Sequence, residues 1–211
     1  MIMRTLALIL ALTLPTVAQA HEVWVERDGA GPARIYLGEP GEPMPAGGDP
    51  EFKRLVAPKF VGTTATRSDR RAGYIEAMVP AKGDLRVTDD AVFAPWGAEG
   101  AKEAVIYYAR AGRSDTSTAM PYEIAPLTAN GNRFALMQGG KPVADAKVTV
   151  VSPDKWTKVL SADANGIVTV PLRGGGRYLL SATKEETGQL AVPAGPVAKI
   201  YHTATTTFVA K

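Results

Sequence analysis

The chain has 211 residues, with 24 lysines and arginines against 21 aspartates and glutamates, and it contains no cysteine. This near-even charge argues against nucleic acid or an anionic membrane surface as a partner, because both select a strong excess of positive charge. The lack of cysteine excludes disulfides and thiolate metal sites, so any bound metal must take nitrogen, oxygen or thioether ligands.

Residues 1–20 have the pattern of a secretory signal peptide. Arg4 supplies the basic start, residues 6–14 form an apolar run with one threonine, and Ala18 and Ala20 are the small residues that the peptidase requires. The apolar run is shorter than the about 20 residues that span a bilayer. We therefore expect export to the periplasm, no direct membrane insertion, and a mature chain that begins at His21. The alternative is a retained N-terminal anchor.

Prolines and glycines separate short β-branched or aromatic runs, and no segment keeps a 3.6-residue apolar period over three turns, which predicts an all-β fold. Residues 21–26 alternate and are expected to form a hairpin with residues 34–37. Residues 38–50 hold too many prolines and glycines for a strand and are expected to form a long candidate binding loop. The charged residues 69–71 are predicted to form a solvated turn. The other strands predicted in this half are residues 60–66, 74–79, 84–88, 104–109 and 122–125.

The turn pattern changes near Asn130, where we place a domain boundary. The expected division is a signal peptide at 1–20, an N-terminal β domain at 21–130 and a C-terminal β-sandwich at 131–211, giving two sandwich-like halves. The strands predicted in the second half are residues 133–137, 146–151, 167–172, 178–183 and 199–209. Its core is expected to contain Val148, Val150, Val168, Val170, Leu180 and Phe208.

Part of this second half resembles a known module. Residues 140–150, residues 162–166 and residues 176–180 are together similar to the transthyretin-like or carboxypeptidase-regulatory-like β-sandwich. The resemblance implies a fold but says little about function, because such modules are accessory in most proteins.

The whole mature chain resembles a narrower group. It has His-x-x-Trp at His21 and Trp24, Tyr-x-Gly-Glu at Tyr36 and Glu39, and the sandwich at its end. These features are similar to an exported, nickel-uptake-like periplasmic family of unknown function. The resemblance implies a link to metal transport, and only His21 matches the N-terminal histidine that related importer subunits use in metal capture. Many members carry a further histidine where this chain has Lys184.

Three residues are the candidate metal ligands. Cleavage before His21 would place an α-amine and an imidazole on one residue, and together they would form a chelate for Ni, Co or Cu. His202 is the other histidine of the chain and lies in the last predicted strand, on the face opposite Tyr201. Glu39 is the candidate oxygen ligand, because it belongs to the Gly-Glu element.

We therefore expect a non-enzymatic periplasmic protein that binds a divalent transition metal and passes it to a membrane metal transporter. Two alternatives remain open. One is a copper monooxygenase of the histidine-brace type, in which His21 and His202 would share one copper ion. The other is an interaction or carbohydrate-binding module without metal. No phosphate loop, dinucleotide motif or nucleophile elbow favours another enzyme class.

Overall fold

The computed structural model describes residues 21–211, and the predicted signal peptide at 1–20 lies outside the described residues. In this part of the chain the fold is all-β, with fifteen strands and one short 3₁₀ helix, η1 (Pro50–Arg54). The prediction of an all-β, sandwich-like fold is confirmed. Residues 21–211 contain no helix of the length and apolar character needed to cross a bilayer.

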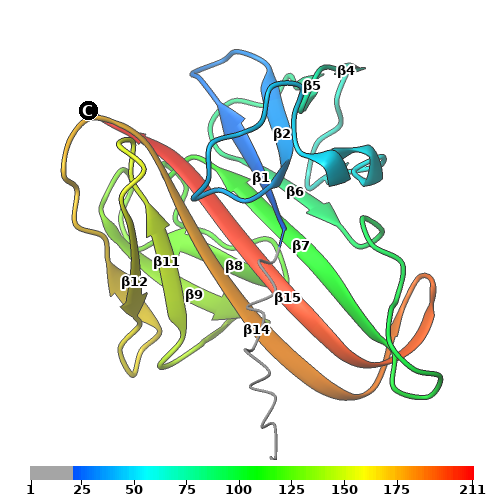
Figure 1. Cartoon of the computed structure of the whole chain (residues 1–211). Coiled ribbons are helices and arrows are strands. Elements are labelled where there is room, and N and C mark those ends of the chain that lie inside the picture. Colours follow the sequence, from blue (N-terminus) through cyan, green and yellow to red (C-terminus); the bar gives the residue numbers. More distant parts are fainter. Residues whose placement is uncertain (1–20) are drawn as a thin grey trace, which may run out of the picture.

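The strands form three sheets (Figure 1). The N-terminal sheet has the order β1 (Glu22–Arg27), β2 (Ala33–Gly38), β5 (Ile75–Met78), β4 (Arg67–Arg70). The central sheet has the order β12 (Thr157–Ser161), β11 (Lys147–Val151), β14 (Gly176–Val192), β15 (Gly195–Ala210), β7 (Glu103–Ala111), β6 (Leu85–Asp89), β3 (Lys59–Phe60). In the C-terminal sheet β9 (Arg133–Gln138) pairs with β8 (Tyr122–Pro126), β10 (Lys141–Pro142) and β13 (Ile167–Thr169).

The long hairpin of β14 and β15 organises the molecule and runs diagonally across it, with β7 alongside (Figure 1). Successive residues of a strand point to opposite faces of its sheet. The Thr205 and Thr207 hydroxyls donate to the carbonyls of Val23 and Val25 in β1, whereas the Thr206 hydroxyl donates to a carbonyl of β8. The N-terminal and C-terminal sheets therefore pack on opposite faces of the central sheet.

Each face of the central sheet has its own apolar core. The core under the N-terminal sheet includes Val23, Ile35 and Tyr107. The core under the C-terminal sheet contains all six residues expected from the sequence: Val148, Val150, Val168, Val170, Leu180 and Phe208. That second core is completed by Tyr108 of β7 and by Tyr122 of β8. The division into 21–130 and 131–211 stays a prediction, but strands from both sides of Asn130 share sheets and cores.

The predicted hairpin of residues 21–26 and 34–37 is present as β1 and β2. The prediction of a strand at residues 60–66 is wrong beyond Phe60, where β3 ends. Gly62 adopts a φ of 73° and turns the chain away from β6. The predicted turn at 69–71 is partly strand, since β4 includes Asp69 and Arg70. This strand lies at the edge of its sheet, where charged side chains are common and an apolar alternation is not needed.

Candidate metal site at His21

His21 immediately precedes β1, at the free edge of the N-terminal sheet. The Tyr107 hydroxyl donates to the His21 carbonyl over 2.8 Å. The carbonyls of Val23 and Val25 accept from Thr205 and Thr207 in the same way. Alternate carbonyls along this edge are thus satisfied by hydroxyl groups of the central sheet. This pairing fixes the backbone at His21 although β1 has a neighbouring strand on one side alone.

A carboxylate faces the imidazole. The Nε2 atom of His21 lies 3.1 Å from Oδ1 of Asp49, at ion-pair distance. The same oxygen accepts the backbone N–H of Glu51 over 2.7 Å, because Asp49 is the N-terminal cap of η1. A carboxylate beside Nε2 favours the tautomer with its proton on that nitrogen, and so leaves Nδ1 with the lone pair.

Asp49 is delivered by the long loop between β2 and η1, which the sequence predicts as a candidate binding loop. The loop is held against the turn before β5, where Gly48 and Gly73 meet backbone to backbone. A Cβ atom added to Gly48 would lie 2.1 Å from the Cα atom of Gly73, so glycine is required for this approach. The close contact places Asp49 beside His21.

The structure does not bring His202 to His21. His21 contacts Tyr107 on one face of the central sheet, whereas the Nδ1 atom of His202 lies 3.1 Å from the Tyr108 hydroxyl on the other face. His202 is buried, and its Nε2 atom lies 2.8 Å from Oε2 of Glu186. The sheet therefore separates the two imidazoles, and a histidine brace that needs both is not formed.

Glu39 lies one residue beyond the last pair of the hairpin, Glu22 with Gly38. Its side chain forms no hydrogen bond or ion pair with residues 21–211, and the carboxylate beside the His21 ring belongs to Asp49 instead. The sequence does signal Asp49 as a helix cap, because an aspartate before a proline often begins a helix. It gives no sign that this cap would contact His21.

A second carboxylate lies close by on the other face of β1. Oε1 of Glu22 accepts the Ser181 hydroxyl over 2.6 Å, while Oε2 is buried with no hydrogen-bond partner. Burial raises the pKa of the Glu22 carboxyl from its ordinary value of 4.5 to about 7, against the smaller opposing effect of the Ser181 hydrogen bond. Glu22 is therefore only partly ionised near neutral pH, and it carries less negative charge beside the site than an ordinary carboxylate would.

His21 also lines a cavity of about 540 Å³, here named the aromatic cavity. Its walls include the rings of Phe93, Trp96, Tyr107 and Tyr201, with Glu103 among them. The ring of Phe93 meets the imidazole edge-on, with 6.3 Å between the centroids and 62° between the planes. The sequence predicts none of these aromatic residues as part of the site, because they come from distant segments.

The described residues, 21–211, contain no group of three or more histidines, aspartates or glutamates placed to hold a metal ion. What this region offers is one imidazole with a free Nδ1 next to its own backbone nitrogen, which would become an α-amine in a chain that begins at His21. These two nitrogens suit a two-point chelate but do not form a closed protein cage. No known protein family, curated protein or solved structure matches the chain.

Proposed function

We propose that this protein is exported, begins at His21 in its mature form, and binds a divalent first-row transition metal through the α-amine and Nδ1 of that residue. The observation that carries the proposal is the position of Asp49, 3.1 Å from the opposite ring nitrogen. Histidines that ligate metals usually present their second nitrogen to a carboxylate or carbonyl, which fixes the ring and raises its basicity.

Nitrogen donors select the metal class. Amine and imidazole nitrogens suit Cu(II), Ni(II) and Co(II), in falling order of affinity, better than calcium or magnesium. The metal is cargo in this proposal, taken up for delivery to a membrane metal transporter. The resemblance to an exported nickel-uptake-like family supports that role, with nickel, cobalt and copper all kept as candidate ions.

The test compares two chains that differ by one residue. One begins at His21, and the other carries an additional alanine before His21, so that the imidazole is kept while the amine is displaced. Titration with Ni(II) or Cu(II) should show a loss of affinity on the order of 10–100-fold or more for the extended chain. His21→Ala in the unextended chain should lose at least as much. Equal affinity of the His21 and Ala-extended chains would remove the amine from the site and overturn the proposal.

A function without metal is the second candidate, and the aromatic cavity favours it. A cavity with aromatic walls and few polar groups is typical of small-molecule sites. Glycan or small-molecule binding that survives treatment with a strong chelator would support this candidate. The position of His202, across the central sheet from His21, argues against a histidine-brace oxidase. Consumption of oxygen by the copper-loaded protein in the presence of a reductant would be evidence for one.

A further inference from the structure

The aromatic cavity has walls that are held in place before any ligand arrives. Trp96 stacks on Tyr201 with 6.0 Å between ring centroids and 12° between planes. The Tyr201 hydroxyl donates to Oε2 of Glu103 over 2.8 Å, and the backbone of Glu103 pairs with that of Trp96. Tyr107 is fixed by its hydrogen bond to the His21 carbonyl. Binding in such a cavity requires little ordering of side chains, which favours affinity.

The cavity is too large and too apolar to serve a bare ion. A water molecule takes about 30 Å³ in the liquid, so the about 540 Å³ of this space far exceeds a metal with its own water ligands. Four of its lining residues are aromatic, and aromatic faces are poor partners for hydrating water. The walls therefore match an organic molecule rather than a hydration shell.

The proposed chelate also leaves coordination positions open. A first-row metal takes about four to six ligands. His21 supplies two nitrogens, and residues 21–211 hold no three-residue ligand group that would complete the set. Because His21 is itself part of the cavity wall, the open positions of its metal are available to a molecule seated in the cavity.

The charges around the cavity limit what that molecule can be. Glu103 is in the wall and Asp49 lies behind the imidazole, so a polycarboxylate chelator would meet like charges. Lys199, 3.8 Å from Oε1 of Glu103, offsets the charge of that carboxylate in part and is shared with Glu185. Arg54, 5.4 Å from the ring centroid of Phe93, is paired with Glu51. A neutral chelator with ring nitrogens avoids the repulsion and can lie against Trp96.

We propose that the aromatic cavity binds a small, planar, nitrogen-donor chelator together with the metal, so that the cargo is a metal–chelator complex completed by His21. This inference rests on the proposed function, since it takes the amine and Nδ1 of His21 as the protein's ligands. The chelator's nitrogens occupy open positions of the metal, and its ring packs on the aromatic wall.

The test uses the chain that begins at His21 and three probes: Ni(II) alone, equimolar Ni(II) with 2,2′-bipyridine, and equimolar Ni(II) with citrate. The bipyridine complex should bind about tenfold more tightly than the aqua ion, as one to two good aromatic contacts provide. The citrate complex should bind no more tightly than the aqua ion. Calorimetry measures the affinities, and the part of the tryptophan fluorescence change that Trp96→Ala removes reports occupancy of the cavity.

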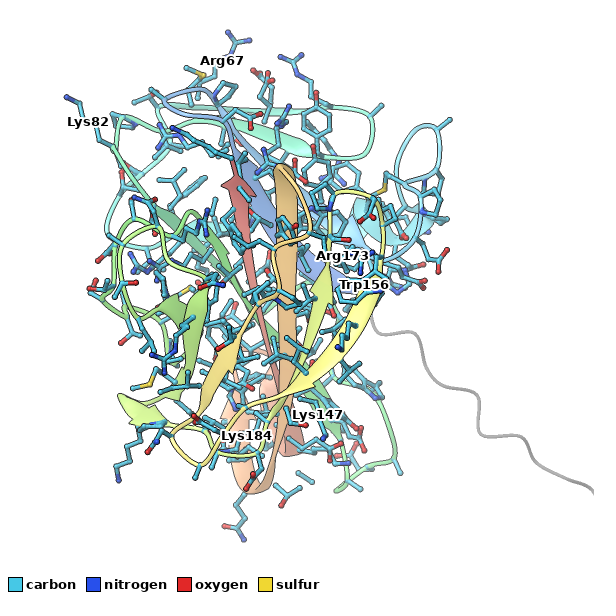
Figure 2. The ribbon with its side chains drawn as sticks, turned by 90° about the vertical axis from the view of Figure 1, so that its left-hand side faces the viewer. Arg67, Lys82, Lys147, Trp156, Arg173 and Lys184 are labelled. Carbon is cyan, nitrogen blue, oxygen red and sulfur yellow. The ribbon has the colours of Figure 1, made fainter. Side chains whose placement is uncertain are left out.

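Variants locate the effect. Trp96→Ala should reduce the advantage of the bipyridine complex to less than about threefold while leaving the affinity for Ni(II) alone unchanged. Trp96→Phe keeps a ring and should keep most of the advantage. Trp156→Ala is the matched control, because Trp156 does not line the aromatic cavity. It lies in the turn just before β12, where the guanidinium of Arg173 is 4.9 Å from its ring centroid (Figure 2).

Equal binding of Ni(II) and its bipyridine complex by the unaltered chain would overturn this inference alone, provided that the Ala-extended chain still loses affinity for Ni(II). An advantage that persists in a folded Trp96→Ala variant would also overturn it. Unchanged Ni(II) binding by the Ala-extended chain would instead overturn the proposed function.

Discussion

His21, just before β1, lies beside Asp49, at the end of the loop between β2 and η1, with Nε2 of the histidine 3.1 Å from Oδ1 of the aspartate. The aspartate oxygen is held in turn by the backbone N–H of Glu51. An imidazole that is aligned in this way on one side presents its other nitrogen in a fixed direction, which is the arrangement that a metal-binding histidine needs.

Replacing Asp49 by alanine should therefore weaken the binding of Ni(II) or Cu(II) by about 10–100-fold, without removing either proposed ligand atom. Asp49→Asn keeps an oxygen acceptor and should lose less. Because Asp49 also caps η1, its removal should lower stability by about 1 kcal/mol, so thermal melts must accompany the titrations. Affinity in a folded Asp49→Ala variant equal to that of the unaltered chain would leave this contact without a role at the site.

The hairpin of β1 and β2 could be predicted from the sequence because its information is local: residues 21–26 alternate in polarity and a glycine-rich turn follows them. The alternation of residues along β15 also correctly predicts that His202 and Tyr201 point to opposite faces of the central sheet. The sequence could not predict which of these two side chains lies on the same side of the central sheet as His21. That depends on the parallel pairing of β7 with β15 and on which sheet covers each face.

Asp49 and the aromatic cavity could not be predicted from the sequence either, because both depend on contacts between distant segments. Asp49 reaches His21 through the contact of Gly48 with Gly73, which joins two loops and has no periodic signature. Phe93 and Trp96 lie in irregular segments after β6, while Tyr201 lies in a strand near the other end of the chain. A site assembled from such segments is set by tertiary packing rather than by local pattern.

Asp89 provides a test of stability against pH. Its Oδ1 atom accepts the backbone N–H of Ala91, but Oδ2 is buried without a hydrogen-bond partner. Burial raises the pKa of this carboxyl, and the nearby Asp90 raises it further. The folded protein therefore holds this proton more tightly than the unfolded chain does, and the contribution of Asp89 to stability falls as pH rises through its folded pKa.

Comparing the unaltered chain with Asp89→Asn isolates this contribution. The free energy of unfolding of the unaltered chain, relative to the variant, should increase as pH is lowered from 7 to 4. Its slope should not exceed about 1.4 kcal/mol per pH unit, the limit for one proton. Urea denaturation across this range measures the difference. Glu42→Gln, in the exposed loop, controls for the loss of one negative charge. A difference that is flat, or that increases toward high pH, would contradict the assignment.

Arg110 is the largest fully buried side chain among residues 21–211 and joins strands of two sheets. Its guanidinium lies 2.6 Å from Oδ2 of Asp84 and 2.8 Å from Oε1 of Glu123, which comes from β8. Arg110→Met would leave two buried carboxylates with fewer cationic partners, although Arg86 still contacts Glu123. Removing one partner of a buried ion pair costs about 3–5 kcal/mol.

We expect the Arg110→Met variant to lose stability on that scale in urea denaturation at neutral pH. Arg67→Met is the control, since this arginine protrudes from the edge strand β4 and forms an exposed pair with Asp69 (Figure 2). Its loss should change stability by less than about 1 kcal/mol. Similar small effects in both variants would mean that the buried network contributes little.

The last prediction concerns residues 131–211 expressed as a fragment. This fragment keeps the six apolar core residues expected from the sequence but lacks Tyr108, Tyr122 and Ile124, which complete their cluster. It also lacks β7, which pairs with β15 from Lys199 to Thr207 and would otherwise cover that edge. An open strand edge and an incomplete core both favour aggregation over folding.

We therefore expect the 131–211 fragment to show no cooperative thermal or urea transition, measured by circular dichroism. A fragment of residues 103–211 restores β7 and β8 and is the matched control. It should fold better than the shorter fragment, although the face that normally contacts β1 would be exposed. A cooperative transition in the 131–211 fragment would contradict this prediction. It would show that the second half folds independently, as the change in turn pattern near Asn130 predicts.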